Sequence, residues 1–154
     1  MDFWLPRSQA GRQDTADQGE AMQQQHADRQ ERGYQDYEKA MRPEDITRLF
    51  VERSNAGDAT GVAALYEENA VLAYPPGGRT VGREAIRELW AAVLAGGPRF
   101  EPEQPLPTLV SGDIALTSTP PRDGTGARAQ VVRRQPDGSW LRLLDQPEFN
   151  PPAR

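Results

Sequence analysis

The chain has 154 residues and a formal net charge of −5 at neutral pH, a length typical of one domain. The acidic balance argues against a nucleic-acid-binding face. The absence of cysteine excludes disulfides, a thiol nucleophile and a zinc–thiolate site.

Two further features of the composition concern the location of the protein. No apolar run in the sequence is long enough to cross a bilayer, so we expect no association with a membrane. The first residues, MDFWLPRSQ, lack the basic and apolar regions of a secretory signal. We therefore expect a cytoplasmic protein.

Residues 1–42 differ from the rest of the chain in composition. They hold eight of the twelve glutamines, and Leu5 is their only Ile, Leu or Val. Ordering a residue costs about 1–2 kcal/mol of backbone entropy, more than the few apolar side chains can return. We predict a polar, Gln-rich arm that is disordered or loosely helical, and that is either solvated or packs on a partner or the pocket. The predicted domain spans 43–149, with a tail at 150–154.

The first predicted helix begins at Pro43, which suits the first helical position. Ile46, Leu49 and Phe50 form an apolar stripe at helical spacing. Turn-forming residues at 55–57 end this helix.

Asp58 is a suitable N-cap for a short second helix, which we expect to run through Tyr66. Residues 70–74 are typical of a strand. The sequence PPGG at 75–78 forces a reversal, so that residues 80–81 pair back.

The third predicted helix spans Arg83–Ala95 and carries regularly spaced apolar residues. Turn residues divide the rest of the chain into extended segments. These segments are 100–110, 114–119, 127–135 and 140–145. Prolines make the first of them irregular. The order predicts an α+β fold, with three helices packed on a curved antiparallel sheet.

Four segments in this order resemble the nuclear transport factor 2-like superfamily: FVERSNAGD, ALYEENAVLAYPPG, VGREAIRELW and VVRRQPDGSWLRLLDQPEF. The last most resembles the SnoaL-like, uncharacterised bacterial group. The resemblance covers 43–149. It implies a cone-shaped fold with a pocket between helices and sheet, and a homodimer formed through the sheet. We expect no cofactor. The superfamily includes ketosteroid isomerase, polyketide cyclases and limonene epoxide hydrolase.

The residues that perform ketosteroid isomerisation in that superfamily are missing here. Tyr74 stands where the isomerase has its general-base Asp, and an ordinary tyrosine is a poor base at neutral pH. Phe50 replaces a hydrogen-bonding Tyr, and Gln130 replaces a protonated Asp. We therefore exclude the standard isomerase mechanism. Limonene epoxide hydrolase uses two Asp that are bridged by an Arg. In this chain Asp145 could be one of the two, and no second Asp on a strand stands out.

Asp145 is the strongest candidate for chemistry. Strict alternation along residues 140–145 puts Leu143 and Asp145 on one face and Arg142 on the other, and the resemblance places the first two in the pocket. Asp145 is there either a general acid or base, or a strand-end residue that caps a turn or pairs with an Arg. Tyr74 is the second candidate catalytic group. The predicted pocket residues are Phe50, Tyr66, Tyr74, Trp90, Gln130, Leu143 and Asp145.

The sequence leaves three functions open. His26 is the only histidine, so a histidine-based triad or a multi-histidine metal site is excluded, and we expect no metal. The first function is a module that binds a small apolar or aromatic molecule without isomerase catalysis. The second is a cyclase, isomerase or hydrolase that uses Asp145, and the third is an interaction module whose arm binds a partner. Whether the protein is an enzyme stays open.

Overall fold

The computed structural model describes residues 10–122 and 126–149. The chain divides into two compact units, residues 1–36 and residues 37–154. Residues 1–9 of the predicted arm and the predicted tail at 150–154 lie outside the described residues.

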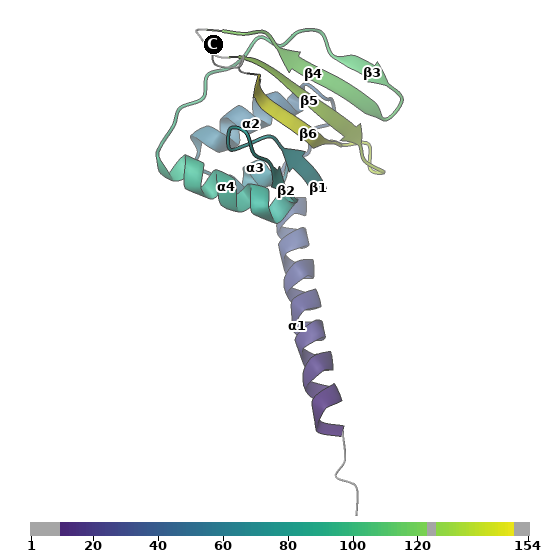
Figure 1. Ribbon diagram of the computed structural model, residues 1–154. Helices are drawn as coiled ribbons and strands as arrows, with labels where there is room; N and C mark the ends of the chain where they lie inside the picture. The colour runs from purple at the N-terminus through teal and green to yellow at the C-terminus, as the bar shows by residue number, and fades with distance from the viewer. Residues whose placement is uncertain (1–9, 123–125, 150–154) are drawn as a thin grey trace, which may run out of the picture. The chain divides into compact units, whose positions relative to one another are not determined.

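The described part of the first unit is a single helix, α1 (Ala10–Gln35), drawn in purple to blue in Figure 1. Its side chains from residue 15 to residue 29 are all exposed. Its many Ala, Gln, Glu and Arg residues have high helix propensity. The structure is helical over these residues. Within the described parts of the chain, no helix is both long and apolar enough to cross a membrane.

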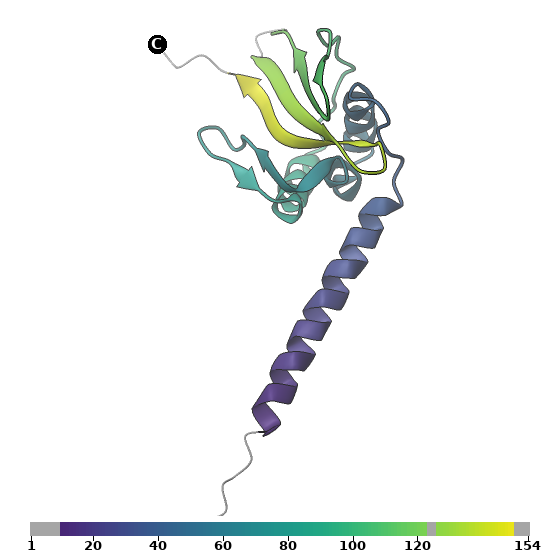
Figure 2. The same cartoon turned by 90° about the vertical axis from the view of Figure 1, so that its right-hand side faces the viewer.

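The described residues of the second unit form three helices and six strands. The helices are α2 (Asp45–Asn55), α3 (Ala59–Ala63) and α4 (Arg83–Ala95). The strands are β1 (Tyr66–Leu72), β2 (Thr80–Val81), β3 (Leu109–Ser111), β4 (Ile114–Thr119), β5 (Ala127–Arg134) and β6 (Trp140–Phe149). The helices gather on one side of the sheet (Figures 1 and 2), which confirms the predicted α+β fold.

The six strands form one sheet in the order β2-β1-β6-β5-β4-β3. Neighbouring strands are antiparallel except β1 and β6, which are parallel. The sheet is therefore mixed, and not the purely antiparallel meander expected from the sequence. A parallel pair needs a long crossover connection, and here the whole chain from β2 to β5 supplies it.

Two predicted elements have different bounds in the structure. The second helix ends at Ala63, and Tyr66 begins β1, because the Arg142 N–H donates to the Leu65 carbonyl and extends the sheet. Of residues 100–110, only the last two belong to β3. The prolines in this segment cannot donate to a strand ladder.

The core lies between the helices and the face of the sheet that they cover. Its largest fully buried side chains come from all three helices and from β1 and β5, together with Leu65 just before β1. They are Ile46, Leu49, Val62, Leu65, Tyr66, Leu72, Ile86 and Val132. Each such aliphatic side chain contributes about 1.5–3 kcal/mol by leaving water.

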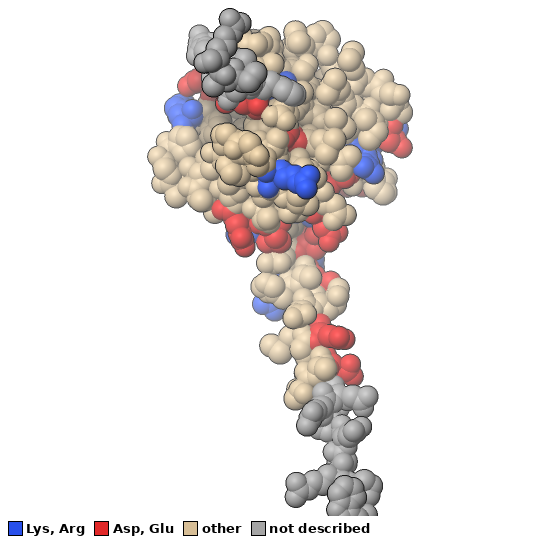
Figure 3. Space-filling view, in the orientation of Figure 1, with Lys and Arg blue, Asp and Glu red and all other residues tan. Residues whose placement is uncertain are grey.

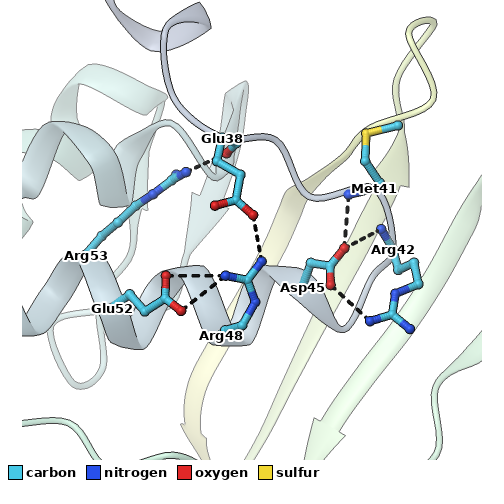
Figure 4. A network of polar contacts seen from close by, with 7 residues as sticks. All are labelled: Glu38, Met41, Arg42, Asp45, Arg48, Glu52 and Arg53. Carbon is cyan, nitrogen blue, oxygen red and sulfur yellow. Dashed lines mark hydrogen bonds and ion pairs between the residues drawn. The ribbon is translucent and has the colours of Figure 1, made fainter.

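The segment before α2 is tied to that helix by polar contacts (Figure 4). Arg48 pairs with Glu38 at 2.8 Å, and the buried Arg53 donates to the Glu38 carbonyl and to the Gly61 carbonyl. Asp45 accepts hydrogen bonds from the backbone N–H groups of residues 41 and 42. Residues 37–42, grouped with the arm in the sequence analysis, therefore contact α2, and the compact unit begins at Tyr37.

Candidate functional site

A cavity of about 860 Å³ opens on the second unit. Its lining comes from α2, α4, the loop that follows α4, β5 and β6, together with Tyr74 after β1 and with the end of β4 and the segment that follows it. Small-molecule sites in proteins are usually concave and enclose about 300–1,000 Å³. The volume of this cavity therefore suits a small organic molecule.

One wall of the cavity is aromatic. Phe50 of α2, Trp90 of α4 and Phe100 of the loop after α4 pack edge to face, with ring centroids 5.2, 5.4 and 6.2 Å apart. Such T-shaped pairs suit the quadrupoles of aromatic rings. Asn55 fixes the loop, since its side chain exchanges two hydrogen bonds with the Phe100 backbone, at 2.8 and 2.9 Å. The aromatic wall is therefore held by the two helices that carry Phe50 and Trp90 and by the hydrogen bonds that fix Phe100.

The cavity also has a polar end, where Arg142 lies against the Phe50 ring of the aromatic wall. Thr117, Gln130 and Asp145 are directly opposite one another on β4, β5 and β6. The Thr117 hydroxyl donates to Gln130 Oε1 at 3.0 Å, and Gln130 Nε2 donates to Asp145 Oδ1 at 3.2 Å. The Tyr66 hydroxyl donates to Asp145 Oδ2 at 2.6 Å, and Arg142 Nη1 lies 3.4 Å from the same oxygen. These five side chains, all buried, are called the Asp145 network below.

A β-bulge in β6 brings Arg142 into this network. Val131 pairs with Leu144 but Val132 pairs with Arg142, so Leu143 is an extra residue in β6. An extra residue shifts the alternation of side chains by one. The predicted alternation is therefore wrong at this point: Arg142 lies on the same face as Asp145.

Aromatic rings hold the Arg142 guanidinium in place. Its central carbon lies 4.9 Å from the Phe50 ring centroid and 5.6 Å from that of Tyr66, distances typical of cation–π contacts. Burial acts to lower the pKa of Arg142, but Asp145 and Tyr66 outweigh it and leave that pKa above its usual value. Arg142 therefore stays charged at any physiological pH.

Tyr66 acts as a permanent donor to Asp145. Burial, with the nearby Asp145 carboxylate, raises the pKa of Tyr66 far above its usual value. Desolvation and a neighbouring negative charge both disfavour the phenolate. The hydroxyl is therefore protonated over the range in which proteins are normally studied.

Five of the seven predicted pocket residues line the cavity: Phe50, Tyr74, Trp90, Gln130 and Asp145. Tyr66 is fully buried and reaches the site through Asp145. Leu143 is not among the lining residues, because it is the extra residue of the bulge.

The two candidate catalytic groups are not joined. Tyr74 lines the cavity but is 38% exposed, and the tyrosine that contacts Asp145 is Tyr66. Arg142 and Thr117 were not predicted as site residues. The signal that could have identified Arg142 is an arginine inside the apolar segment WLRLLD, three residues before an Asp.

Within the described residues, no group of three or more histidines, aspartates or glutamates is arranged to hold a metal ion. On the face drawn in Figure 3, the Lys and Arg side chains of the second unit stand in separate places, with acidic side chains between them. This face carries no extended basic patch of the kind that binds nucleic acid.

Comparison with known proteins gives a family and a fold. Residues 47–143, more than half of the chain, match the model of a family described as SnoaL-like domain. Comparison with curated proteins finds no match.

Solved structures with the same fold include proteins of different descriptions. A candidate calcium/calmodulin-dependent protein kinase type II association domain from Thiobacillus denitrificans aligns with a TM-score of 0.58 and 18% identity, over 71% of this chain and 96% of its own. A Nostoc punctiforme protein of unknown function with a cystatin-like fold aligns with a TM-score of 0.53 and 19% identity, over 70% of this chain and 88% of its own. A ketosteroid isomerase-like protein from Erwinia carotovora atroseptica aligns with a TM-score of 0.52 and 21% identity, over 66% of this chain and 88% of its own. At these identities the likeness establishes the nuclear transport factor 2-like fold alone.

Proposed function

The chain belongs to the SnoaL-like domain family, and we propose that it binds a small molecule with an apolar or aromatic body in the cavity described above. The observation that carries this proposal is the pairing of an aromatic wall with a buried polar end in one cavity of about 860 Å³. The rings offer apolar contact area, and a few convergent polar groups offer orientation.

The residues that stand where ketosteroid isomerase has its functional groups support binding without isomerase catalysis. Phe50 lies against the Arg142 guanidinium, and Gln130 uses both ends of its amide inside the Asp145 network. Tyr74, half exposed at the cavity lining, has no role in that network. Phe50 is therefore part of the aromatic wall, Gln130 is a member of the Asp145 network, and Tyr74 is an exposed residue of the cavity lining.

Tryptophan fluorescence tests the proposal. The variant W4F/W140F leaves Trp90 as the single tryptophan, and its indole lines the cavity. Titration with neutral bicyclic and tricyclic aromatic compounds should give a saturable change in emission. Phe50→Ala should weaken this binding about tenfold or more, because a large buried contact is lost. Glu88→Ala, an exposed change on α4 away from the cavity, is the matched control. Absence of a saturable signal for every compound contradicts the proposal.

A second function, catalysis of the cyclase, isomerase or hydrolase type with Asp145 as general acid or base, is favoured by one observation. Asp145 is a buried carboxylate that lines a largely apolar cavity, the setting in which carboxyl groups serve as proton carriers. Three side chains already donate to it, so a substrate proton must compete with them. For this reason we rank binding first.

Proton abstraction is testable without knowing the natural substrate. In D₂O, a general base beside a bound aromatic methyl ketone replaces the hydrogens of the methyl group by deuterium, which NMR detects. Catalysed exchange that Asp145→Asn abolishes, in a protein that stays folded, supports catalysis. Exchange at the rate of buffer alone, for a ketone shown to bind, refutes it.

We also propose that the protein forms a homodimer through the outer face of the sheet. Successive cross-strand partners give one apolar row across all six strands. The row consists of Val81, Val71, Leu144, Val131, Leu116 and Leu109. Four of the six side chains are more than a third exposed, and contiguous exposed apolar surface marks interaction sites. A row of Val and Leu side chains is self-complementary, as a two-fold interface requires.

Light scattering after size exclusion tests the dimer. The variant L116K/L144K places two charges on the row and should give a monomer at a concentration where the wild type is a dimer. Glu88→Lys is the control for added charge elsewhere. A wild type that elutes as a monomer contradicts the proposal.

A further inference from the structure

The residues that line the cavity keep hydrogen-bond donors that no described group uses. Arg142 Nε and Trp90 Nε1 are buried without a partner, and both residues line the cavity. All hydrogen bonds of the Arg142 side chain run through Nη1, at 3.3 Å to Tyr66 and 3.4 Å to Asp145. Both distances exceed the usual range for N–H···O bonds. Within the described residues, Arg142 thus has two nitrogens, Nε and Nη2, without an acceptor.

Each acceptor oxygen of Asp145 and Gln130 at this end already has a donor. Asp145 Oδ1 accepts from Gln130, and Asp145 Oδ2 accepts from Tyr66 and lies near Arg142. Gln130 Oε1 accepts from Thr117. The side-chain groups that have no partner are therefore donors, and a ligand that matches them must present an acceptor.

Charge decides which kind of acceptor fits. Arg142 and Asp145 form a buried ion pair, so their charges offset each other. The whole lining is also balanced, with four Arg and four acidic side chains. A charged ligand group would leave a net charge in a poorly solvated site, which is costly. A neutral acceptor avoids that cost.

Arg142 is also held ready for such a contact. The Phe50 and Tyr66 rings fix its guanidinium, and a donor held in place loses little conformational entropy on binding. Among the other members of the Asp145 network, the Tyr66 hydroxyl donates its only proton to Asp145, and Gln130 Nε2 uses one of its two N–H groups there.

We propose that Arg142 selects the polar group of the ligand, donating from Nη2 or Nε to a neutral acceptor oxygen carried by an aromatic or apolar body. This inference rests on the proposed binding function and assigns its specificity.

Three compounds of one shape test the specificity by calorimetry. They are 2-acetylnaphthalene with a neutral acceptor, 2-ethylnaphthalene without one, and 2-naphthoate with an anionic one. A hydrogen bond to a charged donor corresponds to a difference of about tenfold or more in Kd. The ketone should therefore bind at least tenfold more tightly than the ethyl compound, and more tightly than the carboxylate.

The outcomes separate this inference from the binding function. Equal binding of the ketone and the ethyl compound, or tighter binding of the carboxylate, overturns the role of Arg142 and leaves binding intact. Failure of all three compounds to bind contradicts the binding function itself. This comparison uses the unaltered protein, so it holds whether or not any variant folds.

A pair of variants assigns the preference to Arg142. Asp145→Asn removes the carboxylate and keeps the guanidinium, so the ketone preference should persist. The double variant R142M/D145N removes both charges together and leaves no unpaired buried ion, and in it the ratio of the two Kd values should fall to about one. A tenfold preference in the folded double variant would mean that another group binds the oxygen.

Discussion

The hydrogen bond between Tyr66 and Asp145 makes a measurable contribution to stability. Tyr66→Phe removes only the hydroxyl that donates to Asp145 Oδ2 at 2.6 Å and keeps the buried ring. A hydrogen bond to a charged group contributes about 1.5–3 kcal/mol, and more is lost when a buried partner stays unsatisfied. Here Arg142 lies 3.4 Å from the same oxygen and compensates in part. We expect a loss of about 2 kcal/mol in the free energy of unfolding.

Urea titration followed by circular dichroism measures this loss by linear extrapolation. Tyr74→Phe is the matched control, because it removes the same atom from a tyrosine outside the Asp145 network, and it should cost less than about 0.5 kcal/mol. The slope against urea should not change. A cost for Tyr66→Phe no larger than that of the control would refute the reasoning that this contact anchors the network.

Three other predictions concern alkaline pH, the packing of one glycine and the support of the aromatic wall. Because the pKa of Tyr66 is raised in the folded protein, its contribution to stability is complete below the unfolded value of about 10 and is lost as pH rises above it. Urea titrations across that range should show a smaller loss in Tyr66→Phe, and an identical loss would contradict this. Gly61→Ala should lower the free energy of unfolding by about 1–3 kcal/mol, because an added Cβ would lie 2.8 Å from the Tyr37 ring. Thermal unfolding measures this loss, and an unchanged Tm would show that the Tyr37 ring moves aside at no cost. Asn55→Ala should weaken the binding of aromatic compounds several-fold, since both hydrogen bonds to the Phe100 backbone are lost; unchanged Kd values would mean that the loop needs no anchor.

The elements set by local patterns were predictable from the sequence. The helix predicted at Arg83–Ala95 has these bounds in the structure, because its apolar spacing and its flanking glycines are all local signals. Trp90 follows from that helix as a wall residue. The α+β class follows from the order of such elements.

The geometry of the site depends on pairings between strands that are distant in the sequence, and local sequence patterns do not predict these pairings. Tyr66 begins a strand because residues near 142 pair with it, and this overrides its helical context. The bulge at Leu143 depends on how β5 and β6 align, and alternation alone placed Arg142 on the wrong face. The Asp145 network was therefore out of reach of periodicity, although the resemblance pointed to Asp145 itself.

The parallel pairing of β1 with β6 has a consequence for how the protein matures. Tyr66 and Arg142 meet in the buried site although 76 positions separate them in the chain. Contacts of such long range form slowly, because a large loop must close before they contribute. During synthesis β1 has emerged long before β6 exists, so one edge of β1 waits unpaired, a state prone to association with other chains. We therefore expect the polar end of the cavity to form late in folding, when β6 pairs with β1.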